Sequence, residues 1–337
     1  MLPRTAMNPI VSNSAALLRG RLAPSPTGHL HLGNAWSFLL CWLAVRSARG
    51  RLVLRMEDID PERSRPHFAE DIMRDLAWLG LDWDEGPDVG GPFAPYTQAA
   101  RLERYTEVIN YLTGMGRTYP CYCTRKELKT MASAPHLEDV GPVYPGTCLG
   151  LGPEQRKERE AQGRRSTLRL CGGEDVGFED FVHGEIRLGW AECGGDFPLR
   201  RSDGVIAYQL AVAVDDMDQN ISLVVRGADI LPCTPRQILL FHLLKAPVPR
   251  YAHVPLLLDH EGERLAKRHQ SCELRALRAQ GVSPQAVVGH LAYRAGLLPS
   301  NEAVSPQELL SVFAWGKIPR EPVKLGSAIV DTLLRVK

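Results

Sequence analysis

Apolar runs alternate with polar and glycine-bearing segments at the start of the chain, and this alternation predicts a strand, a helix and a second strand. Residues 18–23 are suited to a short strand. Residues 35–47, AWSFLLCWLAVRS, are apolar at most positions and are followed by Gly50, which predicts a buried helix. Residues 52–56 predict a second strand. Strand, helix and strand in this order form a βαβ unit, so we expect an α/β fold with a parallel sheet.

The middle of the chain departs from this pattern. Residues 68–79 and 102–115 have the apolar spacing of amphipathic helices. From residue 119 to about 200 the sequence is rich in turns, cysteines and short strands, which predicts an inserted domain. Residues 207–216, AYQLAVAVDD, and 221–230, ISLVVRGADI, then predict two strands of the returning α/β pattern.

The last part of the chain is expected to be helical, with a helix at 237–244 and mostly helix after Ser271. The first residues mix apolar, polar and basic side chains without the layout of a signal peptide. We therefore divide the chain into a loose tail, two halves of a Rossmann-like domain, an inserted domain and a small C-terminal helical domain. The predicted boundaries are 1–17 for the tail, 18–116 and 204–271 for the two halves, 117–203 for the insert, and 272–337 for the helical domain.

Composition indicates the compartment and the kinds of partner of the protein, but it says little about its activity. The 337 residues include 40 basic and 39 acidic side chains, so any nucleic-acid partner must be met by local basic patches. No apolar run is long enough to span a membrane. We expect a cytoplasmic monomer, in which the eight cysteines serve metal binding or packing before disulfides.

Two loops carry candidate chemistry for binding phosphate. APSPTGHLHLGNA, residues 23–35, leads into the first helix, whose N-terminal N–H groups favour an anion. There Gly33 permits close approach to the backbone, and His31 can donate to a phosphate oxygen. GERLAKRHQ, residues 262–270, brings Lys267 as a mobile cation for a polyphosphate. Taken singly, each loop has a plainer interpretation: His31 as a helix cap, and the second loop as a solvated basic turn.

Together the two loops resemble the paired signatures of class I aminoacyl-tRNA synthetases. APSPTGHLHLG is similar to the HIGH motif and RLAKR to the KMSKS motif. Departures are Arg264 at the first lysine of KMSKS, Ala266 at its serine, and Asn34 at the last histidine of HIGH. Further blocks resemble the glutamyl branch in order over residues 20–272: RMEDIDPERSR, WLGLDWDEGP, YPCYCTRKEL, SDGVIAYQLAVAVDD and VVRGADILPCTPRQ.

The resemblance implies ATP-dependent activation of L-glutamate at a site built from these blocks. It assigns ATP to His31, Gly33, Asn34, Arg264 and Lys267, with His31 and Lys267 as the catalytic residues and Mg²⁺ accompanying ATP. It assigns glutamate to Arg21, Ser25, Glu57, Tyr208 and Arg226. Charge supports this set, because arginine offers forked donors to a carboxylate and Glu57 offers an anion to an ammonium group.

Cysteines in the insert suggest a structural zinc site. Cys121, Cys123 and Cys148 lie in a turn-rich stretch, and three thiolates go far toward a tetrahedral site. The resemblance implies that Tyr144, four residues before Cys148, is the fourth ligand. His136 is the alternative, and Cys171 and Cys193 are expected to be structural.

The length of the chain after the second signature separates the functional alternatives. Residues 269–337 are too few for a long helical anticodon reader. This resembles a short form of the glutamyl branch, which activates glutamate without tRNA and transfers it to queuosine in the anticodon of tRNA(Asp). Arg164, Arg165 and Arg169 are candidate RNA contacts, with a solvated face as the alternative. Other open functions are an ordinary glutamyl-tRNA synthetase, a different nucleotidyltransferase and an inactive RNA-binding paralogue.

Overall fold

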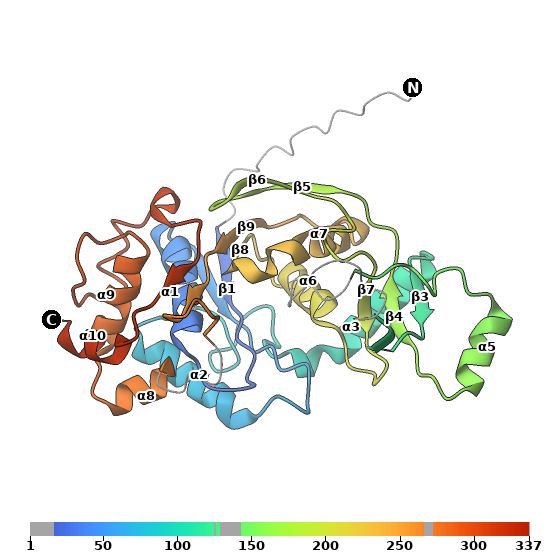
Figure 1. Ribbon diagram of the computed structural model, residues 1–337, viewed down its shortest axis with the longest axis horizontal. Helices are drawn as coiled ribbons and strands as arrows, with labels where there is room; N and C mark the ends of the chain where they lie inside the picture. The colour runs from blue at the N-terminus through green and yellow to red at the C-terminus, as the bar shows by residue number, and fades with distance from the viewer. Residues whose placement is uncertain (1–16, 125, 129–142, 266–271, 337) are drawn as a thin grey trace, which may run out of the picture.

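A parallel β-sheet lies at the centre of the molecule (Figure 1). β1 (Arg19–Leu22) pairs in parallel with β2 (Arg51–Leu54), and α1 (Leu32–Ser47) connects them. The predicted βαβ unit is therefore confirmed. This computed structural model describes residues 17–124, 126–128, 143–265 and 272–336.

A second parallel pair continues the sheet. β8 (Leu223–Gly227) runs parallel to β9 (Arg250–Val254). The backbone N–H of Ser222, directly before β8, donates to the carbonyl of Arg19 at 2.9 Å, which puts β8 beside β1. The carboxyl ends of β1 and β8 thus reach the same edge of the sheet, where ligands of such folds bind.

The sequence of α1 explains its central position. The helix is apolar on nearly every side, which suits burial rather than a surface position. Trp36 is 1% exposed, and its indole N–H donates to the carbonyl of Pro255 at 2.7 Å. The helix begins at Leu32, three residues before the predicted start, so Gly33 and Asn34 belong to its first turn.

A hairpin from the predicted insert joins this central sheet. β5 (Val176–Asp180) and β6 (Gly184–Leu188) pair antiparallel, and Asp180 of β5 also pairs with Tyr251 of β9. The sheet order is β6-β5-β9-β8, and the hairpin runs along the top of the molecule in Figure 1. The other strands of this segment form a separate antiparallel sheet: β3 (Thr118–Cys121), β4 (Thr167–Leu170) and β7 (Phe197–Arg200).

The predicted helices at 68–79, 102–115 and 237–244 are confirmed with small shifts of their ends. The expectation of mostly helix after Ser271 is not met, because turns, bends and irregular backbone occupy most of residues 295–328. Two short strands, β10 (Leu257–Leu258) and β11 (Val323–Lys324), pair in parallel. Further α-helices among the described residues are α2 (Pro66–Trp78), α3 (Leu102–Gly114), α5 (Pro153–Ala161), α7 (Thr234–Leu243), α8 (Leu274–Ala279), α9 (Pro284–Arg294) and α10 (Ile329–Arg335).

The strand predicted at residues 207–216 is wrong, because this segment forms helix α6 (Tyr208–Asp218). The run Leu210 to Val214 is buried at every position, in a core shared with residues of α3, α7 and β7. A buried helix and a buried strand are both apolar throughout, so periodicity does not separate them. In the helix, Asp215 and Asp216 are both buried beside the sheet.

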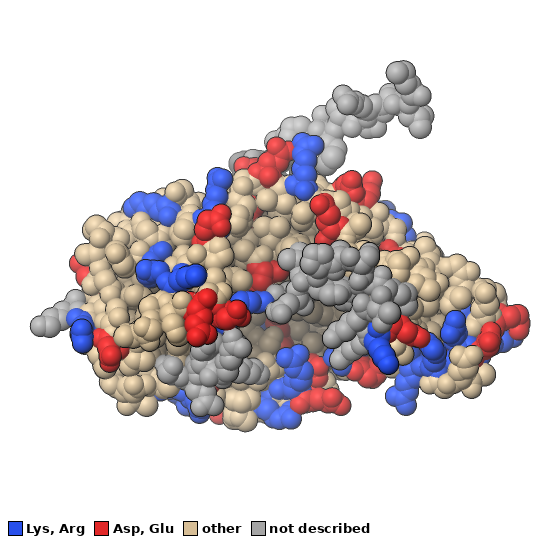
Figure 2. All heavy atoms as spheres, in the orientation of Figure 1, with Lys and Arg blue, Asp and Glu red and all other residues tan. Residues whose placement is uncertain are grey.

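Charged groups of both signs are spread over the visible face of the described residues (Figure 2). Basic and acidic side chains are intermingled there, which agrees with the nearly balanced composition. Among the described residues, no helix combines the length and apolarity needed to cross a membrane.

Candidate active site

A cavity of about 430 Å³ opens where the carboxyl ends of β1 and β8 meet the start of α1. Its lining includes every described residue predicted to bind glutamate or ATP: Arg21, Ser25, His31, Gly33, Asn34, Glu57, Tyr208, Arg226 and Arg264. Lys267 and Ala266 lie outside the described residues. Segments more than 200 residues apart in sequence thus contribute charged and polar groups to one cavity.

His31 caps the helix that leads out of the cavity. Its ring Nδ1 accepts from the backbone N–H of Gly33 at 3.1 Å, and the backbone N–H of His31 donates to Oδ1 of Asn34 at 3.1 Å. This reciprocal pair is a capping box, which fixes the first turn of α1. A Cβ on Gly33 would lie 2.9 Å from the His31 ring, so glycine is needed for this arrangement. The capping bond uses Nδ1 as its acceptor.

Arg21 is buried in the cavity wall and held by two protein acceptors. Its Nε lies 3.1 Å from the Asp216 carboxylate, and its Nη1 donates to the carbonyl of Val225 at 3.2 Å. Asp216 belongs to the helix that was predicted as a strand. The guanidinium is therefore fixed in place before any ligand enters.

Arg55 is a buried cation that the sequence analysis missed. Its Nη1 lies 2.8 Å from Asp216, and its Nη2 lies 3.1 Å from Glu57. It is 0% exposed, and neighbouring carboxylates raise its pKa despite the cost of desolvation. The sequence held two signals: this arginine ends an apolar strand two residues before the predicted Glu57, and it opens the block RMEDIDPERSR.

Burial shapes the acid–base behaviour of two pocket residues. Desolvation raises the pKa of Glu57, although Arg55 and Arg21 oppose this shift. Desolvation and the charge of Glu57 raise the pKa of Tyr208 to about 12, so its phenol stays neutral. An ammonium group brought beside Glu57 would favour the carboxylate over the acid.

Arg226 is held by three different side chains in a buried network. Its Nε donates to His253 Nε2 at 3.1 Å, its Nη1 to Gln237 Oε1 at 2.7 Å, and its Nη2 to Thr234 Oγ1 at 2.8 Å. Gln237 also donates to Gln209 at 2.8 Å. None of these partners was predicted. Gln209, Thr234 and Gln237 lie in blocks of the resemblance that gave them no role, and His253 on β9 lies outside those blocks.

The loop of the second signature is anchored at its start. Arg264 forms an ion pair with Asp229, which follows β8, and both residues line the cavity. The backbone N–H groups of Glu261 and Glu263 donate to the Asp259 carboxylate at 3.0 and 2.8 Å, which forms the turn before Arg264.

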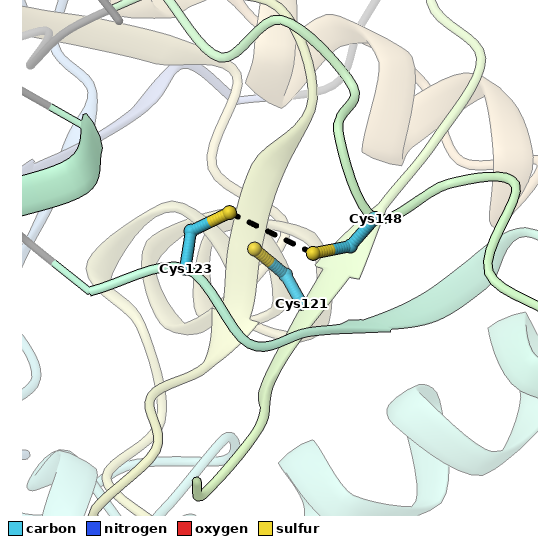
Figure 3. A group of neighbouring side chains, drawn as sticks. All are labelled: Cys121, Cys123 and Cys148. Carbon is cyan, nitrogen blue, oxygen red and sulfur yellow. Dashed lines mark hydrogen bonds between the residues drawn. The ribbon is translucent and has the colours of Figure 1, made fainter. Parts of the chain in front are cut away.

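Three of the predicted metal ligands converge at the end of β3. The sulfurs of Cys121, Cys123 and Cys148 point toward one another (Figure 3) and all lie within 4.8 Å. The Tyr144 hydroxyl contacts this group, because it accepts from the N–H of Cys148 at 2.9 Å and hydrogen-bonds Cys121. The Arg169 guanidinium covers the Tyr144 ring at 3.9 Å. His136 lies outside the described residues.

The candidate RNA contacts in the predicted insert differ in accessibility. Arg169 is 6% exposed and belongs to the cysteine site, so it is not a surface contact. Arg164 is paired with Glu127 at 2.9 Å, and Arg165 is exposed. Arg165 is therefore the best placed of the three for a phosphate.

Comparison with known proteins gives a consistent result. Residues 17–320 match the profile of the catalytic domain of class I tRNA synthetases (E and Q). The Glutamyl-Q tRNA(Asp) synthetase of Nitratidesulfovibrio vulgaris is 54% identical over 318 residues, which cover 94% of this chain and 98% of that protein. Glutamate–tRNA ligase 2 of Acidithiobacillus ferrooxidans is 41% identical, and the match covers 90% of this chain and 64% of the ligase. The solved glutamate-tRNA synthetase of Elizabethkingia anophelis superposes with a TM-score of 0.77 at 26% identity, over 94% of this chain and 69% of that one.

Proposed function

Because this chain belongs to the class I tRNA synthetases of the E and Q type, we propose that it activates L-glutamate with ATP and transfers the glutamyl group to queuosine in tRNA(Asp). The observation that carries this proposal is the contrast between relatives. Identity is 54% with a Glutamyl-Q tRNA(Asp) synthetase and 41% with a glutamate–tRNA ligase. The two proposed steps, activation of glutamate by ATP and transfer of the glutamyl group, are together the reaction of an ATP-dependent ligase.

Activation needs no side-chain nucleophile. An oxygen of the glutamate α-carboxylate attacks the α-phosphorus of ATP, the bond to the β-phosphate oxygen breaks, and pyrophosphate leaves. A ring hydroxyl of queuosine then attacks the acyl carbon and gives up its proton, the bond from that carbon to the phosphate oxygen breaks, and AMP leaves. The protein contributes positioning and charge stabilisation. Mg²⁺ bound with ATP would neutralise part of the phosphate charge.

For glutamate we assign the two carboxylates to Arg21 and Arg226 and the ammonium group to Glu57, with Ser25 and Tyr208 completing the pocket. Support comes from the charges in the cavity wall. Arg21 and Arg226 are both buried, and both are held by protein partners, so their reorganisation on binding is small.

For ATP we assign the phosphates to the start of α1, with His31, Gly33 and Asn34, and to the second loop, with Arg264 and Lys267. The helix N-terminus supplies partial positive charge to this end of the cavity. Lys267 is assigned to the leaving pyrophosphate as a mobile point charge.

A structural zinc ion fits the donor set in the insert. Zinc–sulfur bonds of about 2.3 Å in a tetrahedron separate two sulfurs by about 3.8 Å. The sulfurs of Cys123 and Cys148 lie 3.6 Å apart, and Cys121 completes the trio. We propose that these cysteines bind zinc, with Tyr144 as the fourth ligand, and that the zinc shapes the insert rather than taking part in the chemistry. Bound there, it would link the end of β3 to the loop carrying Cys148.

The deciding experiment is exchange of labelled pyrophosphate into ATP, dependent on glutamate and without RNA. Exchange supports glutamate activation without tRNA. If exchange appears only after adding tRNA(Glu), the ordinary synthetase is favoured instead. If no exchange appears with any tRNA, the chain is not an active ligase. Transfer of labelled glutamate to queuosine-containing tRNA(Asp), compared with the same tRNA lacking queuosine, then tests the acceptor.

A further inference from the structure

Behind Arg226 lies a buried pair of side chains that does not face the cavity. His253 on β9 is 0% exposed, and its Nε2 accepts from Arg226 Nε at 3.1 Å. Its Nδ1 lies 2.7 Å from the Asp180 carboxylate. Asp180 therefore connects to Arg226 through one imidazole ring.

The hairpin of β5 and β6 fixes the position of Asp180. Its Oδ1 accepts from the backbone N–H groups of Val182 and His183 at 2.9 and 3.0 Å. Its Oδ2 accepts from both the backbone N–H and the ring Nδ1 of His253. Hydrogen bonds to His253 and these N–H groups lower the pKa of Asp180 against the effect of burial, so the group is a carboxylate at neutral pH.

A carboxylate only accepts hydrogen bonds, so it requires the proton of His253 on Nδ1. Burial lowers the pKa of His253 to about 4, which makes the ring neutral at pH 7. A neutral ring with its proton on Nδ1 presents a lone pair at Nε2. Both groups that reach Nε2 can donate: the Nε–H of Arg226 and the hydroxyl of Thr234 at 3.0 Å.

We infer that Asp180 is a positioning residue for glutamate recognition: it fixes the tautomer of His253, and His253 in turn orients Arg226 toward the cavity. This inference rests on the proposed function, in which Arg226 binds a glutamate carboxylate. It gives the hairpin a role in substrate binding, although the hairpin lies within the segment predicted as the insert and lines no part of the cavity.

The opposite tautomer would disrupt the arrangement. With the proton on Nε2, the ring would direct an N–H at the Nε–H of Arg226, and two donors would meet. Arg226 would then have to turn away from His253, and its contacts with Gln237 and Thr234 would shift with it. Replacing Asp180 by asparagine makes this change, because the amide N–H₂ would face Nδ1 and move the ring proton to Nε2.

The test compares Asp180→Asn with Glu179→Gln, which makes the same carboxylate-to-amide change on an exposed neighbour in β5. Pyrophosphate exchange gives KM for glutamate, KM for ATP and kcat. We expect Asp180→Asn to raise KM for glutamate by about tenfold or more, while KM for ATP changes by less than about twofold. Glu179→Gln should match the wild type. An unchanged KM for glutamate, or an equal rise in both KM values, would overturn the inference.

Asp180→Asn also places a donor against the backbone N–H of His253, and the variant can fail to fold. A second measurement therefore uses the wild-type protein labelled with ¹⁵N in its histidine rings, with His253→Gln identifying the signal. A neutral ring protonated at Nδ1 at pH 7 is expected, and a ring protonated at Nε2 or doubly protonated would contradict the inference. This readout stays valid if the wild type shows no glutamate-dependent exchange, a result that would instead reject the proposed function.

Discussion

The carboxylate of Asp216 on α6 lies 2.8 Å from Nη1 of Arg55 and 3.1 Å from Nε of Arg21. All three side chains are nearly or fully buried, with exposures of 4% or less for Arg21, Arg55 and Asp216. One carboxylate therefore separates two guanidinium groups that would otherwise repel each other in the cavity wall. The pKa of Asp216 is lowered, because these two arginines outweigh the effect of its burial.

Asp216→Asn should destabilise the protein by about 3–5 kcal/mol, the usual cost of removing one partner from a buried charge pair. The KM for glutamate should rise as well, because Arg21 loses the group that orients its Nε. Unfolding in urea and pyrophosphate exchange measure the two effects. Asp218→Asn is the matched control, since Asp218 is two residues away on the same helix, also binds arginines, and is 23% exposed. Equal destabilisation by both variants would contradict the special role of Asp216.

The first βαβ unit could be predicted from the sequence because each of its elements has a local signal. The strands are short apolar runs, and α1 has a glycine-bearing start and a glycine after its end. Helix α6 could not be recognised in this way. Its apolar run of alanines and valines fits a buried strand equally well, and only packing against α3 and α7 decides for the helix.

In the candidate site too, some residues could be found from a local sequence pattern and others could not. Arg21, His31 and Glu57 lie in motif-bearing loops and strand ends, so a sequence pattern pointed to them. Arg55, the partner of Glu57, opens the block RMEDIDPERSR but was given no role there, and His253, the partner of Arg226, lies in β9 outside every quoted block. What selects these partners is contact between segments distant in the chain, such as the 164 positions that separate Arg55 from Gln219. The spacing of residues within one segment does not predict contacts between segments that are distant in the chain.

Lys267→Ala should lower the rate of adenylate formation strongly and leave glutamate binding nearly unchanged. The reason is that a point charge at the leaving pyrophosphate acts on the transition state, where the negative charge shifts. Removal of one such group typically costs about 10²–10³ in rate. Pyrophosphate exchange and a separate glutamate-binding titration measure the two quantities. Unchanged turnover would remove Lys267 from the mechanism.

Cys148→Ser should reduce the zinc content of the purified protein, because it removes one of three converging sulfurs. Cys171→Ser serves as the control, since Cys171 lies outside the group of three sulfurs. Metal analysis of the two variants beside the wild type gives the result. Cys148→Ser protein with the full zinc content would show that other residues hold the metal.

The fourth zinc ligand can be decided by two further variants. Tyr144→Phe removes the hydroxyl that contacts Cys121 and the N–H of Cys148, and it keeps the ring that Arg169 covers. We expect it to weaken zinc retention in a chelator competition, whereas His136→Ala should retain zinc as the wild type does. The reverse order of the two variants would assign the ligand to His136.

Stability should depend on pH through Asp75, a carboxylate on α2 that is 1% exposed and lies 3.2 Å from Nη1 of Arg278 on α8. Burial raises its pKa to about 6, from about 4 in an unfolded chain. Between these values the folded protein holds a proton that the unfolded chain has released. The contribution of Asp75 is therefore fully present below pH 4 and is lost as the pH rises through 6.

Asp75→Asn removes this titration, so the stability of the wild type relative to the variant should fall between about pH 4 and pH 6 and stay level above that range. Urea unfolding of both proteins at several pH values measures the difference. Arg278→Gln provides a second check, because the Arg278 charge lowers the pKa of Asp75. Its loss should move the window to higher pH, and a difference between wild type and Asp75→Asn that is flat with pH would show that Asp75 does not titrate in this range.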